Sequence, residues 1–144
     1  MIRIVCVGKI KEKFYRDAID EYLKRLSKYH KVNIIEINDS NIKNEAQEIL
    51  KKIDNKDYII TMEIEGQQLS STELSNLIDK TFINYSNITF IIGGSDGLDD
   101  EIKKLSNYKL SFSKLTFPHQ LFRVNLLEQI YRALKINNNE SYHK

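Results

Sequence analysis

The chain alternates strand-like runs with helical patterns, and this order constrains its fold more than any other feature. The strand-like runs are rich in β-branched residues and are expected at residues 2–7, 32–37, 58–64, 88–92 and 108–117. Helices are expected between and after them, at residues 14–29, 41–53, about 71–85, 98–106 and 118–136. Strands that alternate with helices usually form parallel sheets covered on both faces. The sequence therefore predicts an α/β fold with a mainly parallel sheet and helices on both faces.

Length and composition narrow the class of protein. The 144 residues contain no Pro/Gly/Ser-rich linker, which predicts one domain, residues 1–144, with a real core. The lone Cys6 lies in the first apolar run, so we expect a buried thiol and no internal disulfide. No run approaches the ~18 apolar residues of a membrane span, and no signal peptide is visible. With three scattered histidines, no metal-ligand cluster is expected, and the predicted location is the cytoplasm.

The last helical pattern places a permanently charged side chain on its apolar side. Read at about 100° per residue, Arg123 falls in the middle of the apolar face, and His119 lies one turn before it. Because a guanidinium is costly to bury without partners, this position indicates a ligand, a partner chain or an internal ion pair. The apolar arc of roughly 200° is wider than one sheet contact needs. The helix therefore faces a second copy of the chain or is heavily buried within a monomer.

The charge of the chain is unevenly distributed. The formal net charge is only +2, but residues 101–144 carry 8 basic and 3 acidic side chains. A basic excess near the candidate helix fits a phosphate-rich partner. It fits a solvated surface of uneven composition equally well.

A glycine-rich turn follows the fourth predicted strand, in the run Ile91-Ile92-Gly93-Gly94-Ser95-Asp96-Gly97. Glycines let a ligand approach the backbone closely, and open α/β sheets bind ligands at the carboxyl ends of their strands. The same run also fits a tight turn that caps the next helix. It is neither GxGxxG nor a Walker loop, so the sequence does not indicate a dinucleotide or ATP site.

A second strand end lies at Met62, which closes the third predicted strand. If the third and fourth strands are neighbours, Met62 and Gly93 lie at the same edge of the sheet, and the segment 112–117 can close over them. Such a slot would hold a flat aromatic ring by apolar contacts and backbone hydrogen bonds. Met62 alone fits core filling as well.

Several stretches spread along the chain carry a resemblance to a known family. They are Val5-Cys6-Val7-Gly8-Lys9, Ile91–Gly97, Leu110–Gln120, Arg123, Glu128–Ala133 and Tyr142-His143-Lys144. Together they resemble the RlmH family, the large-subunit ribosomal RNA methyltransferases of the SPOUT superfamily. The resemblance covers essentially the whole chain, although the stretch of about 39–57 is shorter than usual for that family.

The resemblance implies a fold, a methyl donor and a substrate. Members are expected to form a deep C-terminal trefoil knot, to dimerise through the knotted region and to bind S-adenosylmethionine in the knot. The implied reaction is methylation of N3 of pseudouridine 1915 in 23S rRNA, within the assembled 70S ribosome. By position, the contacts to the donor fall on Met62, Gly93, Phe112, Ser113, Lys114, Leu115, Thr116 and Phe117.

N3 of a pseudouridine carries a proton that must leave before or during methyl transfer, and four residues are candidates for this chemistry. We hypothesise that Arg123 stabilises negative charge on the base or positions a phosphate, and that His119 or His143 accepts the proton. Tyr142 is a candidate for stacking on the base. His119 also fits a hydrogen bond within its own loop, and the tail can serve its own subunit's site or the partner's.

Two other functions fit the same residues. The first is a SPOUT methyltransferase with a different RNA target, for which the fold and the donor site would be unchanged. The second is a non-catalytic α/β domain that binds the ribosome or a small ligand.

Overall fold

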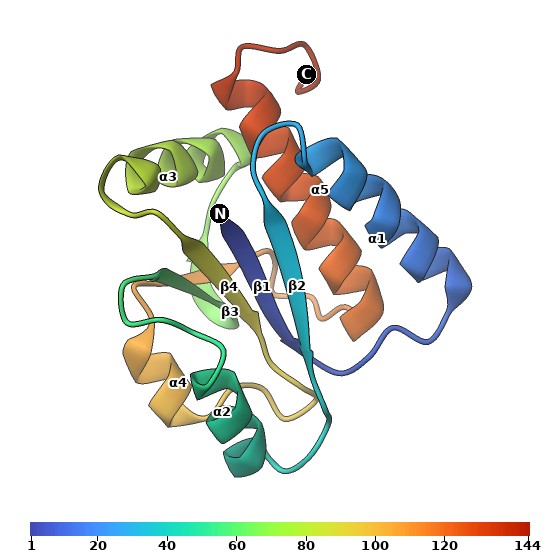
Figure 1. Ribbon diagram of the computed structural model, residues 1–144, viewed down its shortest axis with the longest axis vertical. Helices are drawn as coiled ribbons and strands as arrows, with labels where there is room; N and C mark the ends of the chain where they lie inside the picture. Colours follow the sequence, from blue (N-terminus) through green and yellow to red (C-terminus); the bar gives the residue numbers. More distant parts are fainter.

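The computed structural model describes all 144 residues and contains a five-stranded sheet whose strands are all parallel (Figure 1). In chain order the elements are β1 (Ile2–Val7), α1 (Lys13–Leu26), β2 (Val32–Ile37), α2 (Ile42–Leu50), β3 (Tyr58–Gln68), α3 (Ser71–Asn84), β4 (Ile88–Ile92), α4 (Asp100–Leu105), β5 (Tyr108–Ser111) and α5 (His119–Asn137). The strand order is β2-β1-β4-β3-β5. The predicted α/β class is confirmed, and β3 and β4 are neighbours, as the slot between Met62 and Gly93 requires.

Helices cover both faces of the sheet, because successive side chains of each strand point to opposite faces. In β1, Ile2, Ile4 and Cys6 join the larger core under α1, α3 and α5. Val5 and Val7 join a smaller core with residues of α2 and α4. β1 is buried except at Arg3, and β4 is fully buried, so both strands are mostly apolar. Cys6 is a core residue as predicted.

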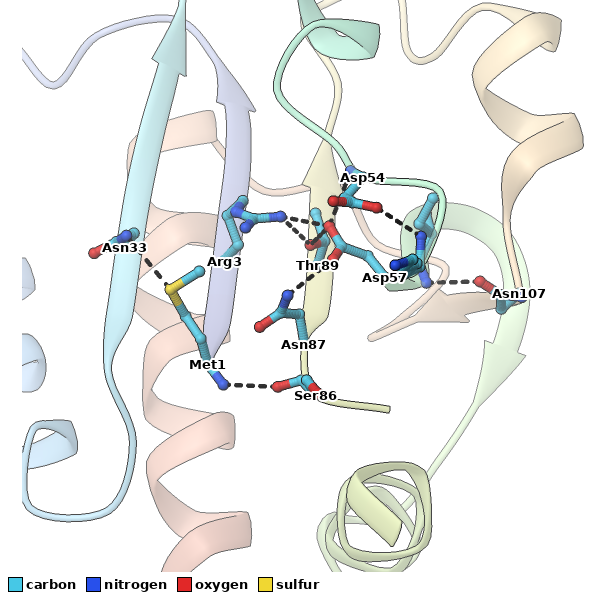
Figure 2. A network of polar contacts seen from close by, with 11 residues as sticks. Met1, Arg3, Asn33, Asp54, Asp57, Ser86, Asn87, Thr89 and Asn107 are labelled. Atoms are coloured by element: carbon cyan, nitrogen blue, oxygen red, sulfur yellow. Dashed lines mark hydrogen bonds and ion pairs between the residues drawn. The ribbon is translucent and has the colours of Figure 1, made fainter. Parts of the chain in front are cut away.

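A polar network ties the strands together at the amino edge of the sheet (Figure 2). The buried Asp57 carboxylate, just before β3, forms an ion pair with Arg3 of β1. It also accepts hydrogen bonds from the Thr89 hydroxyl at 2.9 Å and the Asn87 amide at 3.2 Å. A buried carboxylate is stable only with such partners. The network stabilises the edge opposite the one where the glycine-rich turn lies.

Two strands end at different residues from those predicted. β3 does not stop near Ile64 but continues through Gly66 to Gln68, with a register shift against β5 between Met62 and Gln67. A Cβ atom at Gly66 would lie 2.7 Å from the carbonyl carbon and oxygen of Lys109, so glycine permits a close approach of the two strands there. β5 ends at Ser111. The residues that follow leave the sheet as an irregular loop, so the predicted strand at 108–117 was too long.

The helices agree with the predictions in number and position but differ at their ends. α1 ends at Leu26, short of the predicted residue 29, and α2 is shortened to residues 42–50 with Asn41 as its N-cap. α4 begins after its N-cap, Asp99, and ends at Leu105, inside the predicted range 98–106. The capping box at the start of α3 is confirmed, because Ser70 and Glu73 each satisfy the other's backbone N–H.

The long helix α5 lies between α1 and α3 on the sheet, as Figure 1 shows. Its buried apolar residues include Leu126, Leu127, Ile130 and Leu134. Four other apolar residues of the helix are only half-buried: Leu121, Phe122, Val124 and Ile136. The chain's own core therefore covers much of the wide apolar arc and leaves part of it half-buried. No helix is both long and apolar enough to cross a membrane.

Candidate active site

A cavity of about 540 Å³ opens at the carboxyl ends of β3, β4 and β5. Its walls are the end of β3, the glycine-rich turn after β4, the loop that follows β5 and the first turn of α5. The volume lies within the range of small-molecule and cofactor sites, and the carboxyl edge is where parallel sheets bind ligands. The cavity is therefore the leading candidate for the site of chemistry.

The cavity gathers most of the residues that the resemblance assigned to the methyl donor. Those that line it are Met62, Gly93, Phe112, Ser113, Leu115, Thr116 and Phe117. Lys114 does not line it, and its side chain is exposed. Three segments that are far apart in the sequence thus meet at one edge, as the strand-end interpretation predicted.

The glycine-rich turn is a tight turn that leads to the next helix, and it also lines the cavity. The N–H of Gly97 donates to the Gly94 carbonyl at 3.0 Å, which folds the turn tightly back on itself. A Cβ atom at Gly93 would lie 2.6 Å from the Gly97 carbonyl oxygen, so only glycine fits there. The turn then leads into α4 through its N-cap, Asp99. Its backbone at Gly93 and Gly94 remains in the cavity wall.

Side-chain hydrogen bonds shape the loop after β5. The Ser111 hydroxyl donates to the Ile64 carbonyl at 3.0 Å, and the Ser113 hydroxyl accepts from the Leu115 N–H at 3.0 Å. Leu115 and Phe117 nevertheless stay 73% and 37% exposed while lining the cavity. Exposed apolar side chains at the mouth of a cavity favour a ligand with an apolar face that covers them.

Carboxylates give the cavity a negative side. Glu63 and Glu65 line it, and both come from β3. The Glu63 carboxylate accepts a hydrogen bond from the Thr61 hydroxyl at 2.6 Å, and the Lys103 ammonium lies 4.0 Å away. Sequence reasoning missed these carboxylates, although their positions at the end of a strand could have suggested them. No group of three His, Cys, Asp or Glu side chains is arranged to hold a metal ion.

The two candidate residues at the start of α5 have different surroundings. His119, the first residue of the helix, lines the cavity. Arg123 does not, and its side chain is only 3% exposed. Its guanidinium donates to the Glu36 carboxylate at 2.6 Å and to the Gly8 carbonyl at 3.1 Å. Of the interpretations that the sequence left open for Arg123, the internal ion pair is the one that the structure contains.

The tail residues Tyr142 and His143 contact the middle and second half of α5, and neither lines the cavity of its own chain. The Tyr142 hydroxyl donates to the Glu128 carboxylate, which raises the pKa of Tyr142 to about 12. The Arg132 guanidinium lies 4.7 Å from the centre of the Tyr142 ring and 3.2 Å from Nδ1 of His143. Glu128 and Arg132 were missed as site candidates, although their i,i+4 spacing on a helix was a usable signal.

The tail is anchored where it leaves α5. Glu140 accepts hydrogen bonds from the Tyr29 hydroxyl at 2.7 Å and from the Lys135 ammonium at 3.0 Å. These two partners lower the pKa of Glu140 to about 2, with the Tyr29 bond the larger cause. The carboxylate therefore stays charged at neutral pH and holds Tyr142 and His143 near α5.

Comparison with known proteins identifies the family. The model of a family described as "Predicted SPOUT methyltransferase" matches residues 1–143. The ribosomal RNA large subunit methyltransferase H of Clostridium botulinum strain Alaska E43 is 51% identical, and the alignment covers 99% of each chain. The chain belongs to the RlmH family of SPOUT methyltransferases. The family member of the same name from Clostridium acetobutylicum is 46% identical over 99% of each chain.

The fold of this family is shared with more distant proteins of known structure. The tRNA (m1G37) methyltransferase from Aquifex aeolicus has a TM-score of 0.54 at 16% identity, covering 91% of this chain and 69% of that one. A probable methylase family protein from Haemophilus influenzae has a TM-score of 0.59 at 11% identity, covering 99% and 70%. Family and fold together confirm the predicted SPOUT architecture with its C-terminal trefoil knot. The family alignments span 157 positions, so the relatives contain residues that this shorter chain lacks.

S-adenosylmethionine is the methyl donor of this family, and the cavity fits its chemistry. The donor has a flat adenine ring, for which the exposed side chains of Leu115 and Phe117 offer apolar contacts. It has a cationic sulfonium and ammonium, for which Glu63 and Glu65 supply negative charge. Backbone groups of the glycine-rich turn supply hydrogen-bonding partners.

Proposed function

We propose that this protein transfers the methyl group of S-adenosylmethionine to large-subunit ribosomal RNA. The proposed target is N3 of pseudouridine 1915 in 23S rRNA, within the assembled 70S ribosome in the cytoplasm. The observation that carries the proposal is the cavity at the carboxyl edge, which brings together seven residues assigned to the donor from the sequence. High identity to ribosomal RNA large subunit methyltransferase H proteins over nearly the full chain supports the substrate.

The residues of the cavity would hold the donor at the end of the sheet. Met62, Gly93 and the loop 112–117 would position it, and Lys114 would contribute through its backbone rather than its exposed side chain. When bound, the donor supplies an electrophilic methyl group. The task of the chain is then to place the target nitrogen in line with that methyl and to exclude water.

We assign to His119 the role of accepting the proton of N3. It lines the cavity beside Phe122 and Phe117, whose rings give that wall an apolar character. An imidazole within hydrogen-bonding reach of the target base can act as a general base. Arg123, which is buried and paired, supports this role by holding the first turn of α5 against β1 and β2 rather than by contacting the base.

We further propose that the protein works as a homodimer in which the tail of one subunit completes the cavity of the other. Tyr142 and His143 do not line their own cavity, and they contact residues of α5 well beyond its first turn. At 1.5 Å per residue the helix rises roughly 14 Å from His119 to Glu128, the partner of Tyr142, and roughly 20 Å to Arg132, the partner of His143. This separation favours a tail that acts on the partner's cavity, with Tyr142 stacking on the base and His143 as an alternative proton acceptor.

Two measurements test the methyltransferase function. Calorimetry should detect binding of S-adenosylmethionine to the purified protein, and no heat of binding would favour a non-catalytic domain. Mass spectrometry of 23S rRNA from a strain without the protein should show position 1915 unmethylated and restored by the wild-type protein. A methyl group lost from another nucleotide instead would point to a different RNA target.

Mixed dimers test the proposed exchange of tails. Gly93→Trp should block the cavity of one chain, and Tyr142→Ala with His143→Ala should remove the tail chemistry of the other. Each variant alone should be inactive. A mixture that forms mixed dimers should regain activity if the tail serves the partner, because one site then has an intact cavity and an intact tail. A tail that serves its own subunit would leave the mixture inactive.

A further inference from the structure

We propose that the loop between β1 and α1, with the first turn of α1, binds a single-stranded stretch of ribosomal RNA beside the cavity. We call this the basic-aromatic surface and define it by Lys9, Lys11, Phe14, Tyr15 and Arg16. The inference rests on the proposed function, which supplies an RNA substrate. It adds the surface by which this chain would hold the nucleotides next to the target.

Unpaired positive charge is the first feature of this surface. Lys9, Lys11 and Arg16 are exposed, and none of them forms an ion pair. At the far end of α1, Arg25 pairs with Glu21 and Lys28 pairs with Glu140, and only Lys24 is left without an ion pair. Three of the four unpaired cations of α1 and its preceding loop therefore lie at the end that faces the carboxyl edge of the sheet. Such a cluster suits phosphates.

An exposed aromatic pair is the second feature. The Phe14 side chain is 65% exposed, and its ring lies 4.4 Å from that of Tyr15, at a 46° angle. Phe14 belongs to neither hydrophobic core. An aromatic ring that is left in water among cations is what proteins use to stack unpaired bases, because every base has a flat apolar face.

The third feature is the fixed position of the loop next to the cavity. The Gly8 N–H donates to the Ile37 carbonyl at 2.7 Å. The N–H groups of Lys11 and Glu12 donate to the Gln120 side chain at 2.8 and 3.3 Å. Gln120 directly follows His119, which lines the cavity. RNA held on the basic-aromatic surface would therefore lie beside the start of α5.

Charge favours RNA over a second copy of the chain as the occupant. In a symmetric dimer a patch at the two-fold axis meets the same patch of the partner. Lys9, Lys11 and Arg16 would then face their own copies, with two unpaired carboxylates, Glu12 and Asp39, near them. Like charges that face each other are unfavourable, whereas RNA phosphates complement them.

The test compares three variants of the full-length protein. Lys9→Glu with Lys11→Glu reverses the charge of the loop, and Phe14→Ala removes the exposed ring. The matched control is Lys52→Glu with Lys80→Glu, which makes the same change in charge at two exposed, unpaired lysines. Lys52 lies before β3, and Lys80 lies in the last turns of α3, which leads to β4. Both are therefore nearer the amino edge of the sheet than the carboxyl edge.

Binding to 70S ribosomes from a strain that lacks the protein is measured by cosedimentation over a range of salt concentrations. The double reversal should weaken ribosome binding at least about 10-fold. It should also reduce the slope of the logarithm of the binding constant against the logarithm of the salt concentration by about 1.4, because each lost phosphate contact on a single strand accounts for about 0.7. Phe14→Ala should weaken it at least about 5-fold. The affinity for S-adenosylmethionine, measured by calorimetry, should stay within about twofold of wild type.

Three outcomes would overturn the inference. The first is a double reversal that binds ribosomes no more weakly than the control pair. The second is a Phe14→Ala variant that binds ribosomes as tightly as the wild type. The third is a Phe14→Ala variant that lowers the molar mass by light scattering, which would make the surface a contact between copies. All three results come from binding and mass measurements and do not depend on catalysis. A wild-type protein that binds ribosomes but not S-adenosylmethionine would therefore count against the proposed methyltransferase function and not against the basic-aromatic surface.

Discussion

Removal of Glu36 should destabilise the protein more than removal of its partner Arg123. The two side chains form one ion pair but differ in burial, because Arg123 is 3% exposed and the Glu36 side chain is 35% exposed. Glu36→Ala leaves a buried guanidinium whose remaining acceptor is the Gly8 carbonyl. Arg123→Met removes the buried charge, keeps an apolar stem and leaves a carboxylate that water reaches.

The magnitudes follow from these burials. Loss of one partner from a buried ion pair costs about 3–5 kcal/mol, and we take about 3 kcal/mol for Glu36→Ala because its carboxylate is partly solvated. Arg123→Met loses charged hydrogen bonds but strands no buried charge, so about 1.5 kcal/mol is expected. In the Arg123→Met background, Glu36→Ala should then add less than about 1 kcal/mol, since no guanidinium remains to be left unpaired.

Urea unfolding at pH 7 measures all four proteins of this double-mutant cycle. The protein concentration must be the same throughout, because association shifts apparent stability. An Arg123→Met variant that loses as much stability as Glu36→Ala would refute the reasoning. It would mean that the guanidinium is not the member of the pair that depends on its partner.

Three further predictions concern the cavity, the core and the tail. Gly93→Ala should weaken binding of S-adenosylmethionine about 10-fold in calorimetry, because its Cβ would press on the Gly97 carbonyl and shift the turn. Burial raises the pKa of Cys6 to about 11, so iodoacetamide at pH 8 should not label the folded protein. The stability that comes from this raised pKa of Cys6 is present at neutral pH. It is lost as the pH rises from about 9 to about 11, because the thiol must then ionise inside the core. Glu140 should titrate near pH 2 in carboxyl NMR, and Tyr29→Phe should move this midpoint up towards its ordinary value of 4.5. The stability that comes from the lowered pKa of Glu140 is present above pH 4.5 and is lost as the pH falls towards 2, where the carboxylate is protonated.

The elements of the sheet could be predicted because their signals are local. The strands β1, β2 and β4, rich in β-branched residues, have the predicted bounds, and the capping box of α3 lies at Ser70 and Glu73. The ends of β3 and β5 could not be predicted in the same way. β3 passes through Gly66 because Lys109 of β5 lies against it, and that contact joins segments more than forty residues apart.

The candidate site was predictable in part. Residues at strand ends and in the family motifs, such as Met62, Gly93 and the loop after β5, meet in one cavity because parallel strands share a carboxyl edge. Contacts of the tail with Glu128 and Arg132 were not predicted, since they depend on how the last residues fold back on α5. Whether that tail reaches the partner's cavity depends on assembly, which no pattern within one chain specifies.

Arg123 separates the two kinds of information. Periodicity alone placed it on the buried side of the last helix, because the helical repeat fixes which side chains share a face. Its partners Glu36 and Gly8 lie 87 and 115 residues earlier in the chain, and only the packing of α5 beside β1 and β2 brings them within hydrogen-bonding distance. The sequence by itself determined that a buried cation needed partners. The tertiary structure decided which ones, because contacts between distant segments depend on the path of the whole chain and not on any local repeat.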